Sequence, residues 1–377
     1  MIQVFSPTLG PAEQAAAAAV LASGWVGFGP KCLEFERAWA AHVGVPAENM
    51  VSVSCATEAL FQVFDEIAIQ TSERLLAGGV VMPAISFIGI ANAVLDSALF
   101  VQLCDVDRHT LNPTVADIER KLDSHTVAVC IQHYGGVPSD LGPIADLCRA
   151  RGVLLVEDCA CAPLSYYGGK RAGTFGDFAV WSFDSMKIIT SAGDGGMVYC
   201  KDAAVADRIR KATRLGQDNL SGQSASGPRW WEFTVAQPGR KAMMNDVQAA
   251  VGLVQLGRLE ELVDKRAERV TDYNLRLYDS EHVDIAHSPQ DIARLRPSYY
   301  CYWIQTDRRD ELAAYLRERG VYTTFRYWPV HRAYNWPSTT PNADWAADHT
   351  LNLPLHANLT RAHVDYICDL IAEFFAQ

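Results

Sequence analysis

The sequence predicts an α/β fold, in which a mostly parallel sheet carries helices on both faces and is followed by a smaller α+β domain. Short apolar segments alternate with helix-like segments through the first two thirds of the chain. The 377 residues suffice for one large and one smaller domain. We place the large domain at residues 1–245 and the C-terminal domain at residues 246–377.

Seven apolar segments of the large domain are predicted strands, and most of them are separated by predicted helices. The strands cover residues 50–54, 80–82, 99–105, 127–132, 153–157, 178–183 and 196–200. The helices cover residues 57–69, 88–95, 115–122 and 144–151. Ligands bind beyond the carboxyl ends of strands in such sheets, so residues that directly follow a strand are the first candidates for a site.

Residues 216–238 are rich in Gly, Ser and Gln and are predicted to form a long loop, of the kind that is usually functional or mobile. A long helix over residues 245–276 is predicted to bridge to the C-terminal domain. That domain is expected to contain a strand at 299–305 and helices at 310–319 and 361–375.

Composition argues against several classes of protein. The net charge of −11 argues against a nucleic-acid binder, which needs a basic face. We find no apolar run near the ~18 residues of a membrane span, and residues 15–22 lack the basic flank of a signal peptide, so we expect a cytoplasmic protein without membrane contact. The ten cysteines form no CxxC pair, which favours reduced thiols and no structural metal.

Asp158 and Lys187 are the most informative pair of residues. Asp158 ends an apolar strand, and Lys187 lies 29 residues later, just past a second strand. An acid and an amine in one pocket suit pyridoxal 5′-phosphate (PLP), because the lysine bonds the aldehyde and the acid keeps the pyridine nitrogen protonated. Taken singly, the residues have plainer explanations, namely a surface lysine and a helix cap.

Three further motifs follow predicted strands. Small residues and Thr57 open a helix after the first strand and suit a phosphate, although Thr57 or Ser54 is equally an ordinary helix cap. Ser182 offers a hydroxyl at the strand end before Lys187. Phe87 has an aromatic ring that can stack on a heterocycle or belong to the core. His133 and His331 are candidates for the same pocket, with a hydrogen-bonded structural histidine as the alternative.

Together these segments resemble the DegT family of sugar aminotransferases, a branch of the fold-type I PLP enzymes. The resemblance extends from Gly29 to Pro354. The matching segments are Ala56-Thr-Glu-Ala-Leu60, Pro83 to Phe87, His133 to Gly136, Glu157-Asp-Cys-Ala-Cys161, Ser182-Phe-Asp-Ser-Met-Lys187, Asp194-Gly-Gly196 and Gly239 to Ala250.

The resemblance implies a function and a set of roles. The protein would transfer an amino group, with L-glutamate as the usual donor, to a nucleotide-linked keto-deoxysugar in amino-sugar biosynthesis. Lys187 would bond PLP and move the proton, Asp158 would pair with the pyridine nitrogen, and Phe87 would stack on the ring. The phosphate would lie on Ala56, Thr57 and Ser182. Lys241 matches a residue that reaches the neighbouring subunit's phosphate, which implies a homodimer with shared active sites.

Three positions depart from the family pattern. The family's Gln that contacts the cofactor is Cys161 here, and a thiol is a weaker hydrogen-bond partner than an amide. The phosphate-loop Gly is Ala56, and the Glu of Glu-Gly-Gly is Asp194. Related dehydratases carry His at the lysine position, so Lys187 indicates transamination.

Two alternatives remain open at this stage. The acceptor can be a carbocyclic or non-nucleotide keto-sugar, and the loop at 216–238 bears on that choice. In that loop, Arg229 is a candidate to bind a diphosphate. Trp230 and Trp231 are candidates to stack on a base or sugar, and the alternative is that they pack at a subunit interface. A non-catalytic ligand sensor with the same fold is the alternative of another class, and it lacks the support of an attached DNA-binding segment.

Overall fold

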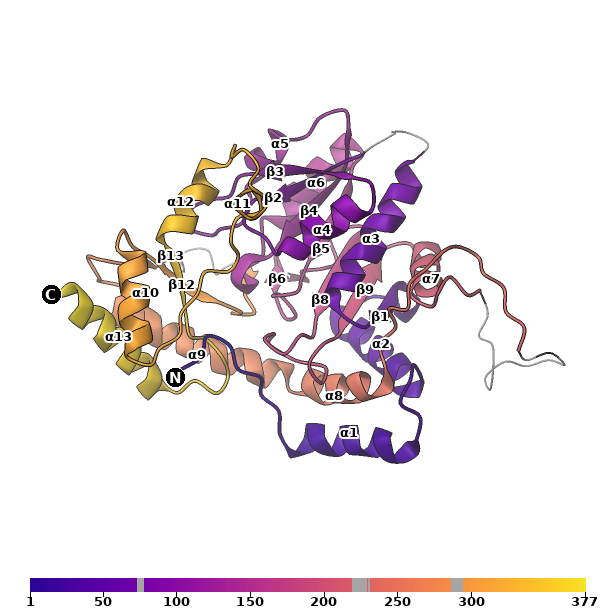
Figure 1. The fold of residues 1–377 in the computed structure, drawn as a ribbon, viewed down its shortest axis with the longest axis horizontal. Coiled ribbons are helices and arrows are strands. Elements are labelled where there is room, and N and C mark those ends of the chain that lie inside the picture. The colour runs from indigo at the N-terminus through magenta and orange to yellow at the C-terminus, as the bar shows by residue number, and fades with distance from the viewer. Residues whose placement is uncertain (73–77, 219–228, 230, 286–293) are drawn as a thin grey trace.

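The computed structural model describes residues 1–72, 78–218, 229, 231–285 and 294–377. A seven-stranded sheet of order β1-β9-β8-β5-β4-β2-β3 forms the centre of the large domain (Figure 1). Its strands are β1 (Met50–Val53), β2 (Gly79–Pro83), β3 (Phe100–Cys104), β4 (Thr126–Gln132), β5 (Leu154–Asp158), β8 (Phe178–Ser182) and β9 (Gly196–Cys200). All seven predicted strands are present, with ends shifted by at most a residue or so.

The sheet is mostly parallel, as predicted. β9 pairs antiparallel with both of its neighbours, β1 and β8, so β9 alone among the seven runs against the rest. The other neighbouring pairs are parallel. The carboxyl ends of β1, β2, β4, β5 and β8 therefore meet at one edge of the sheet, and β9 begins there.

Helices cover both faces because successive strand residues point to opposite sides. Val51 and Val53 enter one apolar cluster, which also contains residues of α3 (Ala56–Thr71), α4 (Ile88–Asp96) and α7 (Ala203–Ala212). Met50 enters the cluster on the other face, with residues of α2 (Pro30–Val43), α5 (Val115–Glu119), α6 (Leu141–Arg151) and α8 (Asp246–Gly257). Outside this layer, α1 (Pro11–Ser23) packs against α8.

The predicted bridging helix is in fact two helices. α8 ends at Gly257 and α9 (Leu259–Leu277) begins after Arg258, whose φ of −106° and ψ of 0° lie outside the helical range. Glycine weakens a helix locally, and the Arg258 side chain is held 2.7 Å from Glu13 of α1. The prediction of one continuous helix over 245–276 is therefore wrong, because the helix is interrupted at Arg258.

The C-terminal part of the chain forms its own small sheet of order β10-β12-β13 and its own apolar cluster. The strands are β10 (Asp284–Ile285), β12 (Tyr302–Gln305) and β13 (Thr350–Leu353), and the helices are α10 (Arg309–Glu318), α11 (Val330–Tyr334), α12 (Pro341–His349) and α13 (Arg361–Phe375). The predicted strand at 299–305 begins later, at Tyr302, and the predicted final helix is present over the same residues.

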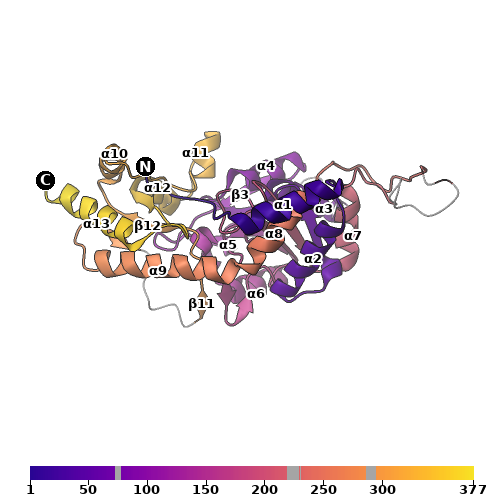
Figure 2. The same cartoon turned by 90° about the horizontal axis from the view of Figure 1, so that it is seen from below.

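Several contacts join the parts of the chain. The first residues lie against the C-terminal domain, where Ile2 bridges to Val321, and both termini lie on that side of the molecule (Figures 1 and 2). A third sheet joins β11 (Leu295–Arg296) to β6 (Tyr166–Tyr167) and β7 (Lys170–Arg171). The division at 245/246 remains a prediction. α8 packs on α1 and α2, whereas α9 packs on α13.

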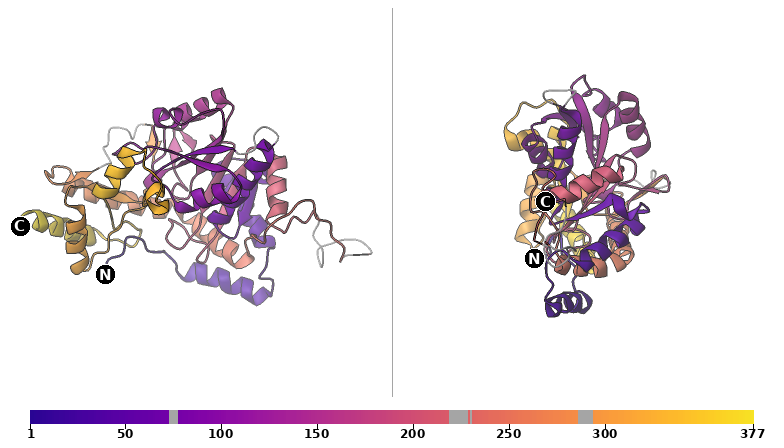
Figure 3. Two further views of the ribbon diagram at one scale, coloured as in Figure 1. Left: turned by 45° about the horizontal axis from the view of Figure 1, so that its top comes forward. Right: turned by 90° about the vertical axis from the view of Figure 1, so that its right-hand side faces the viewer.

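Part of the predicted loop at 216–238 lies on an arm that projects from the large domain (Figures 1 and 3). Its described residues contain no helix, and Gln217 bridges to Val235 near the base of the arm. Trp230 lies outside the described residues.

Within the described ranges, we find no helix with the length and apolar character that a membrane span requires. All ten cysteines are free.

Candidate active site

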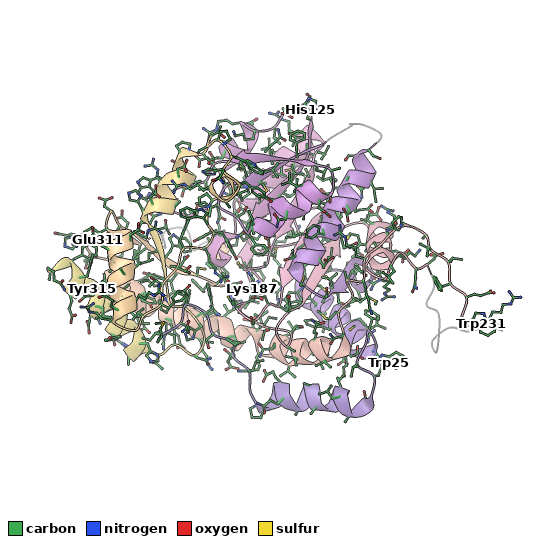
Figure 4. The ribbon with its side chains drawn as sticks, viewed as in Figure 1. Trp25, His125, Lys187, Trp231, Glu311 and Tyr315 are labelled. Carbon is green, nitrogen blue, oxygen red and sulfur yellow. The ribbon has the colours of Figure 1, made fainter. Side chains whose placement is uncertain are left out.

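The candidate site lies at the edge of the sheet where the parallel strands end. Asp158 is the last residue of β5 and pairs with Gln132 of β4 on one side and Val180 of β8 on the other. Ser182 ends β8, and the turn that follows it contains Lys187. Figure 4 shows Lys187 near the centre of the molecule. The sheet thus brings together the acid and the amine that the sequence singled out.

Three side chains surround the Lys187 amine. Its Nζ lies 3.6 Å from the Cys161 Sγ, 3.4 Å from the Tyr327 Oη and 4.6 Å from the centre of the Tyr300 ring. Cys161 follows Asp158 by three residues, whereas the two tyrosines come from the C-terminal part of the chain. The amine therefore sits where the two parts of the chain meet.

Burial and charge act in opposite directions on the pKa of Lys187. Burial disfavours the ammonium, but Cys161, Tyr300 and Asp158 more than compensate and raise the pKa above its ordinary value. Burial raises the pKa of Asp158, and a hydrogen bond from the Ala160 N–H together with the charge of Lys187 offsets part of that rise. A cationic ring nitrogen near Asp158 would stabilise its ionised form further.

The N-terminus of α3 forms a cradle beside Ser182. Gly196 pairs with Ser182 on one side and with Val53 on the other. A Cβ at Gly196 would lie only 2.7 Å from the backbone N of Ala56, so glycine permits the close approach of β9 to the helix start. The first amides of a helix lack partners within the helix and favour an anion.

The helix cap differs from the prediction. Neither Thr57 nor Ser54 caps α3. The N-cap is Cys55, whose Sγ accepts a hydrogen bond from the Glu58 N–H at 3.4 Å. Thr57 lies within the first turn of the helix, so its hydroxyl is not used as a cap and remains a candidate for the cradle.

Phe87 lies beside Tyr327 and is partly open to solvent. It is the N-cap residue of α4, its side chain is exposed, and its N–H donates to the Gln132 Oε1 at 2.8 Å. The Phe87 ring meets the Tyr327 ring edge-on, with centroids 5.8 Å apart. Since Tyr327 also contacts Lys187, an aromatic face is available close to the amine, and the core alternative for Phe87 does not hold.

The structure supports a structural role for His133. Its ring is fully buried, its Nδ1 accepts from the Ser139 N–H at 3.3 Å, and its Nε2 lies 3.5 Å from Glu157. His133, Glu157 and Cys159 are close enough to hold a metal ion. However, Glu157 already accepts hydrogen bonds from three backbone N–H groups, those of Gly173, Phe175 and Gly176, so its carboxylate is occupied.

His331 is also engaged within the C-terminal domain. Its Nε2 lies 2.9 Å from the Asp344 carboxylate, its Nδ1 lies 3.4 Å from the Thr340 hydroxyl, and its ring is buried. These contacts favour the structural alternative over a role toward substrate.

The arm residues lie apart from this pocket within one chain. Arg229 is exposed and pairs with Glu232 at 2.7 Å. Figure 4 shows Trp231 at the far end of the arm, well away from Lys187. Lys241 is exposed at the base of the arm, where it bridges to Arg214. These residues therefore do not join the Lys187 cluster of their own chain.

The assembled groups fit PLP as a set. The site contains an amine and, three residues before the thiol that contacts it, a buried carboxyl. It also contains a partly exposed aromatic ring and a helix N-terminus near a serine hydroxyl. Each of these groups matches one part of the cofactor, namely the aldehyde, the ring nitrogen, the ring face and the phosphate.

The comparisons with known proteins identify the class. Residues 7–372 match the DegT/DnrJ/EryC1/StrS aminotransferase family, and the chain belongs to that family. It is a sugar aminotransferase that uses PLP.

Individual relatives agree with this assignment. A dTDP-4-dehydro-2,3,6-trideoxy-D-glucose 4-aminotransferase of Saccharopolyspora spinosa is 40% identical over 375 residues, which cover 98% of this chain and 95% of that protein. The structure of the aminotransferase TlmJ from Streptoalloteichus hindustanus superposes with a TM-score of 0.92 at 45% identity, covering 100% of this chain and 99% of that one. The sugar aminotransferase CalS13 from Micromonospora echinospora gives 0.88 at 27% identity, covering 99% and 100%.

Sequence reasoning missed two residues that contact Lys187. Tyr300 and Tyr327 contact Lys187 from the C-terminal domain, more than 100 positions away in the chain. Tyr327 lies four residues before His331, which the sequence analysis selected instead. Tyr300 follows no motif, and no signal in the sequence distinguishes it from a core tyrosine.

Proposed function

We propose that this sugar aminotransferase moves an amino group from L-glutamate to C4 of a dTDP-linked 4-keto-deoxyhexose. The relative that supports this acceptor is the S. spinosa 4-aminotransferase, which is 40% identical along nearly the whole chain. The observation that carries the chemistry is the Lys187 amine, placed 3.6 Å from Cys161 at the strand end that also presents Asp158.

Each residue of the site has a proposed role. When bound, PLP supplies an electron sink for the carbon that gains or loses the amino group. Lys187 holds the cofactor and moves the proton at that carbon. Asp158 would keep the ring nitrogen protonated, Phe87 would offer its ring face to the cofactor ring, and Ala56, Thr57 and Ser182 would hold the phosphate. Cys161, which stands where the family has Gln, would give the cofactor a weaker hydrogen bond than an amide.

We also propose a homodimer with shared active sites, in which Lys241 reaches the phosphate of the partner. Exposed apolar side chains near and on the arm support an interface in this region: Trp25, Val26, Leu215, Trp231, Phe233 and Val235. Trp231 lies far from Lys187 of its own chain, so the arm could contact substrate only at the active site of the partner. In such a dimer, Trp231 could either stack on a base or sugar at the partner's site or pack at the subunit interface.

A cytoplasmic location is part of the proposal. It is supported by the ten free cysteines, nine of which are buried, since reduced thiols are typical of proteins in a reducing compartment.

The test of the acceptor is a direct assay. PLP-loaded protein is incubated with L-glutamate and dTDP-4-dehydro-2,3,6-trideoxy-D-glucose, and the product is analysed by mass spectrometry and NMR. The proposal predicts an amine at C4 of the nucleotide-linked sugar, formed together with 2-oxoglutarate. Turnover of free keto-sugars or carbocyclic ketones in place of the nucleotide sugar would favour the alternative acceptor class.

A further inference from the structure

Arg326 lies beside the Lys187 cluster without a carboxylate partner in the part of the chain that the structure describes. Its guanidinium donates to the Met186 Sδ at 2.9 Å, and its carbon CZ lies 4.7 Å from the centre of the Phe5 ring. A thioether is a weak acceptor, and a guanidinium has five N–H donors. Most of the hydrogen-bonding capacity of this half-buried cation is therefore available to a ligand.

Another arginine close by shows the contrast. Arg266 is buried, and its Nη1 donates to the backbone carbonyls of Tyr299, Tyr300 and Leu355. Its place in the fold is explained by these contacts. Arg326 has no comparable set of protein acceptors, so packing alone does not explain a guanidinium at its position.

Two connections fix Arg326 relative to the reactive amine. The Arg326 guanidinium lies against Phe5, the Phe5 ring stacks on Tyr300 at 4.9 Å, and the Tyr300 ring lies 4.6 Å from the Lys187 Nζ. In addition, Met186 precedes Lys187 directly, and Tyr327 follows Arg326 and contacts the amine at 3.4 Å. Arg326 is therefore linked to Lys187 through the Phe5 and Tyr300 rings and also through its neighbours Met186 and Tyr327.

We propose that Arg326 binds the α-carboxylate of the amino donor through paired N–H···O hydrogen bonds. This inference rests on the proposed function. The α-carboxylate is attached to the same carbon as the amine that is transferred, so it must lie next to Lys187 during the reaction. A planar guanidinium matches a carboxylate in two-point geometry. The diphosphate of the acceptor is separated from C4 by the sugar ring, which places it farther from the amine.

The first experiment compares the two half-reactions in the PLP-loaded protein. Arg326→Gln and Arg326→Lys are measured against wild type with L-glutamate as donor and with the nucleotide keto-sugar as acceptor. Arg319→Gln is the matched control, because Arg319 also stacks on an aromatic ring, that of Tyr315, far from Lys187 (Figure 4). We expect KM for L-glutamate to rise about ten- to a hundredfold in Arg326→Gln, as for loss of a charged hydrogen bond. The KM for the acceptor should stay at the wild-type value.

A second measurement does not depend on turnover. L-2-methylglutamate keeps both carboxylates but lacks the hydrogen that the reaction removes, so its binding is measured by calorimetry. We expect its affinity to fall in Arg326→Gln by the same factor as for L-glutamate. We also expect wild type to prefer L-glutamate strongly over 4-aminobutyrate, which lacks the α-carboxylate, and Arg326→Gln to lose most of that preference.

The outcomes separate this inference from the proposed function. Unchanged affinity for L-glutamate and its 2-methyl analogue in Arg326→Gln overturns the inference, and a raised acceptor KM in its place would assign Arg326 to the diphosphate. A wild-type protein that transfers no amine from L-glutamate overturns the proposed function together with the inference. If Arg326→Gln does not fold, Arg326→Lys decides, because lysine keeps the charge but not the fork. A glutamate affinity equal to wild type in that variant contradicts the proposal.

Discussion

Asp158 is a buried carboxyl whose ionised form is disfavoured in the protein without cofactor. Burial raises its pKa, and the folded protein therefore binds the carboxyl proton more tightly than the unfolded chain, where the pKa is ~3.9. The stability that this group contributes is complete at low pH and is lost as the pH rises through the raised pKa. Near neutral pH, the ionised carboxylate costs the cofactor-free fold stability.

Asp158→Asn should therefore have opposite effects on the free and the loaded protein. Without cofactor, the variant should unfold at a higher temperature than wild type at about pH 8, and the difference should shrink as the pH falls. With PLP, wild type should gain more stability from binding than the variant, because the asparagine does not pair with a cationic ring nitrogen. Scanning calorimetry of both forms at several pH values measures this.

The control is Asp207→Asn, an exposed acid that pairs with Lys211 on the surface. Its unfolding temperature should change little, within the ~0.5 kcal/mol typical of surface substitutions, with or without PLP. A cofactor-free Asp158→Asn protein that is less stable than wild type across this pH range would show that the carboxylate has stabilising contacts that outweigh its burial.

At the scale of elements, the start of β9 and the start of α3 depend on each other. A Cβ at Gly196 would lie 2.7 Å from the Ala56 N and 2.8 Å from the Cys55 carbonyl carbon, and both are backbone atoms that cannot rotate away. Gly196→Ala should destabilise the fold by about 1–3 kcal/mol, as overpacking does. It should also weaken PLP binding, because the helix start must move. Denaturant unfolding and a PLP titration measure the two effects.

Gly257→Ala is the matched control for this prediction. Gly257 ends α8, and a Cβ there would have open space around it. Alanine is a better helix former than glycine, so we expect a neutral or slightly stabilising change and unaltered PLP affinity. PLP affinity equal to wild type in Gly196→Ala would argue that the cradle at α3 does not hold the phosphate.

The elements themselves were largely predictable from the sequence. The strands of a parallel sheet are buried on both faces and read as short apolar runs, which is why all seven were found. The break at Arg258 was missed. Gly257 is a local signal for it, whereas the contact of Arg258 with Glu13, 245 positions away, leaves no local pattern. The cap at Cys55 was missed because a thiol is a rare cap, and the usual residues, Ser54 and Thr57, flank it.

The pocket was predictable only in part. Residues that directly follow strands, such as Asp158 and Lys187, are placed by the order of elements along the chain. Tyr300, Tyr327 and Arg326 reach the pocket only because the C-terminal domain packs against the large domain. No local pattern records that packing. The N-terminal segment contributes to the same packing, because Phe5 stacks on Tyr300.

At the scale of the whole molecule, the proposed dimer makes a prediction about mixed subunits. If each site combines Lys187 of one protomer with Lys241 of its partner, Lys187→Ala and Lys241→Ala should each be impaired as homodimers. Mixed after reversible dissociation, they should recover about a quarter of wild-type activity, because half of the dimers are hybrids and each hybrid keeps one intact site.

The control mixes Lys187→Ala with Lys201→Ala. Lys201 is exposed and pairs with Asp177, outside the pocket. Its homodimer should have full activity, and mixing should give activity in proportion to the number of intact Lys187 sites. No recovery when the Lys187→Ala and Lys241→Ala proteins are mixed would show that the two lysines do not act across a subunit boundary.

The central claim is that Lys187 is the residue that bonds PLP. The most direct measurement is to load the protein with PLP, reduce it with borohydride, digest it and locate the attached cofactor by mass spectrometry. The account predicts one modified peptide, with the cofactor on Lys187, and its loss when L-glutamate is added before the reductant. Attachment at another lysine, or no attachment at all, would contradict the account.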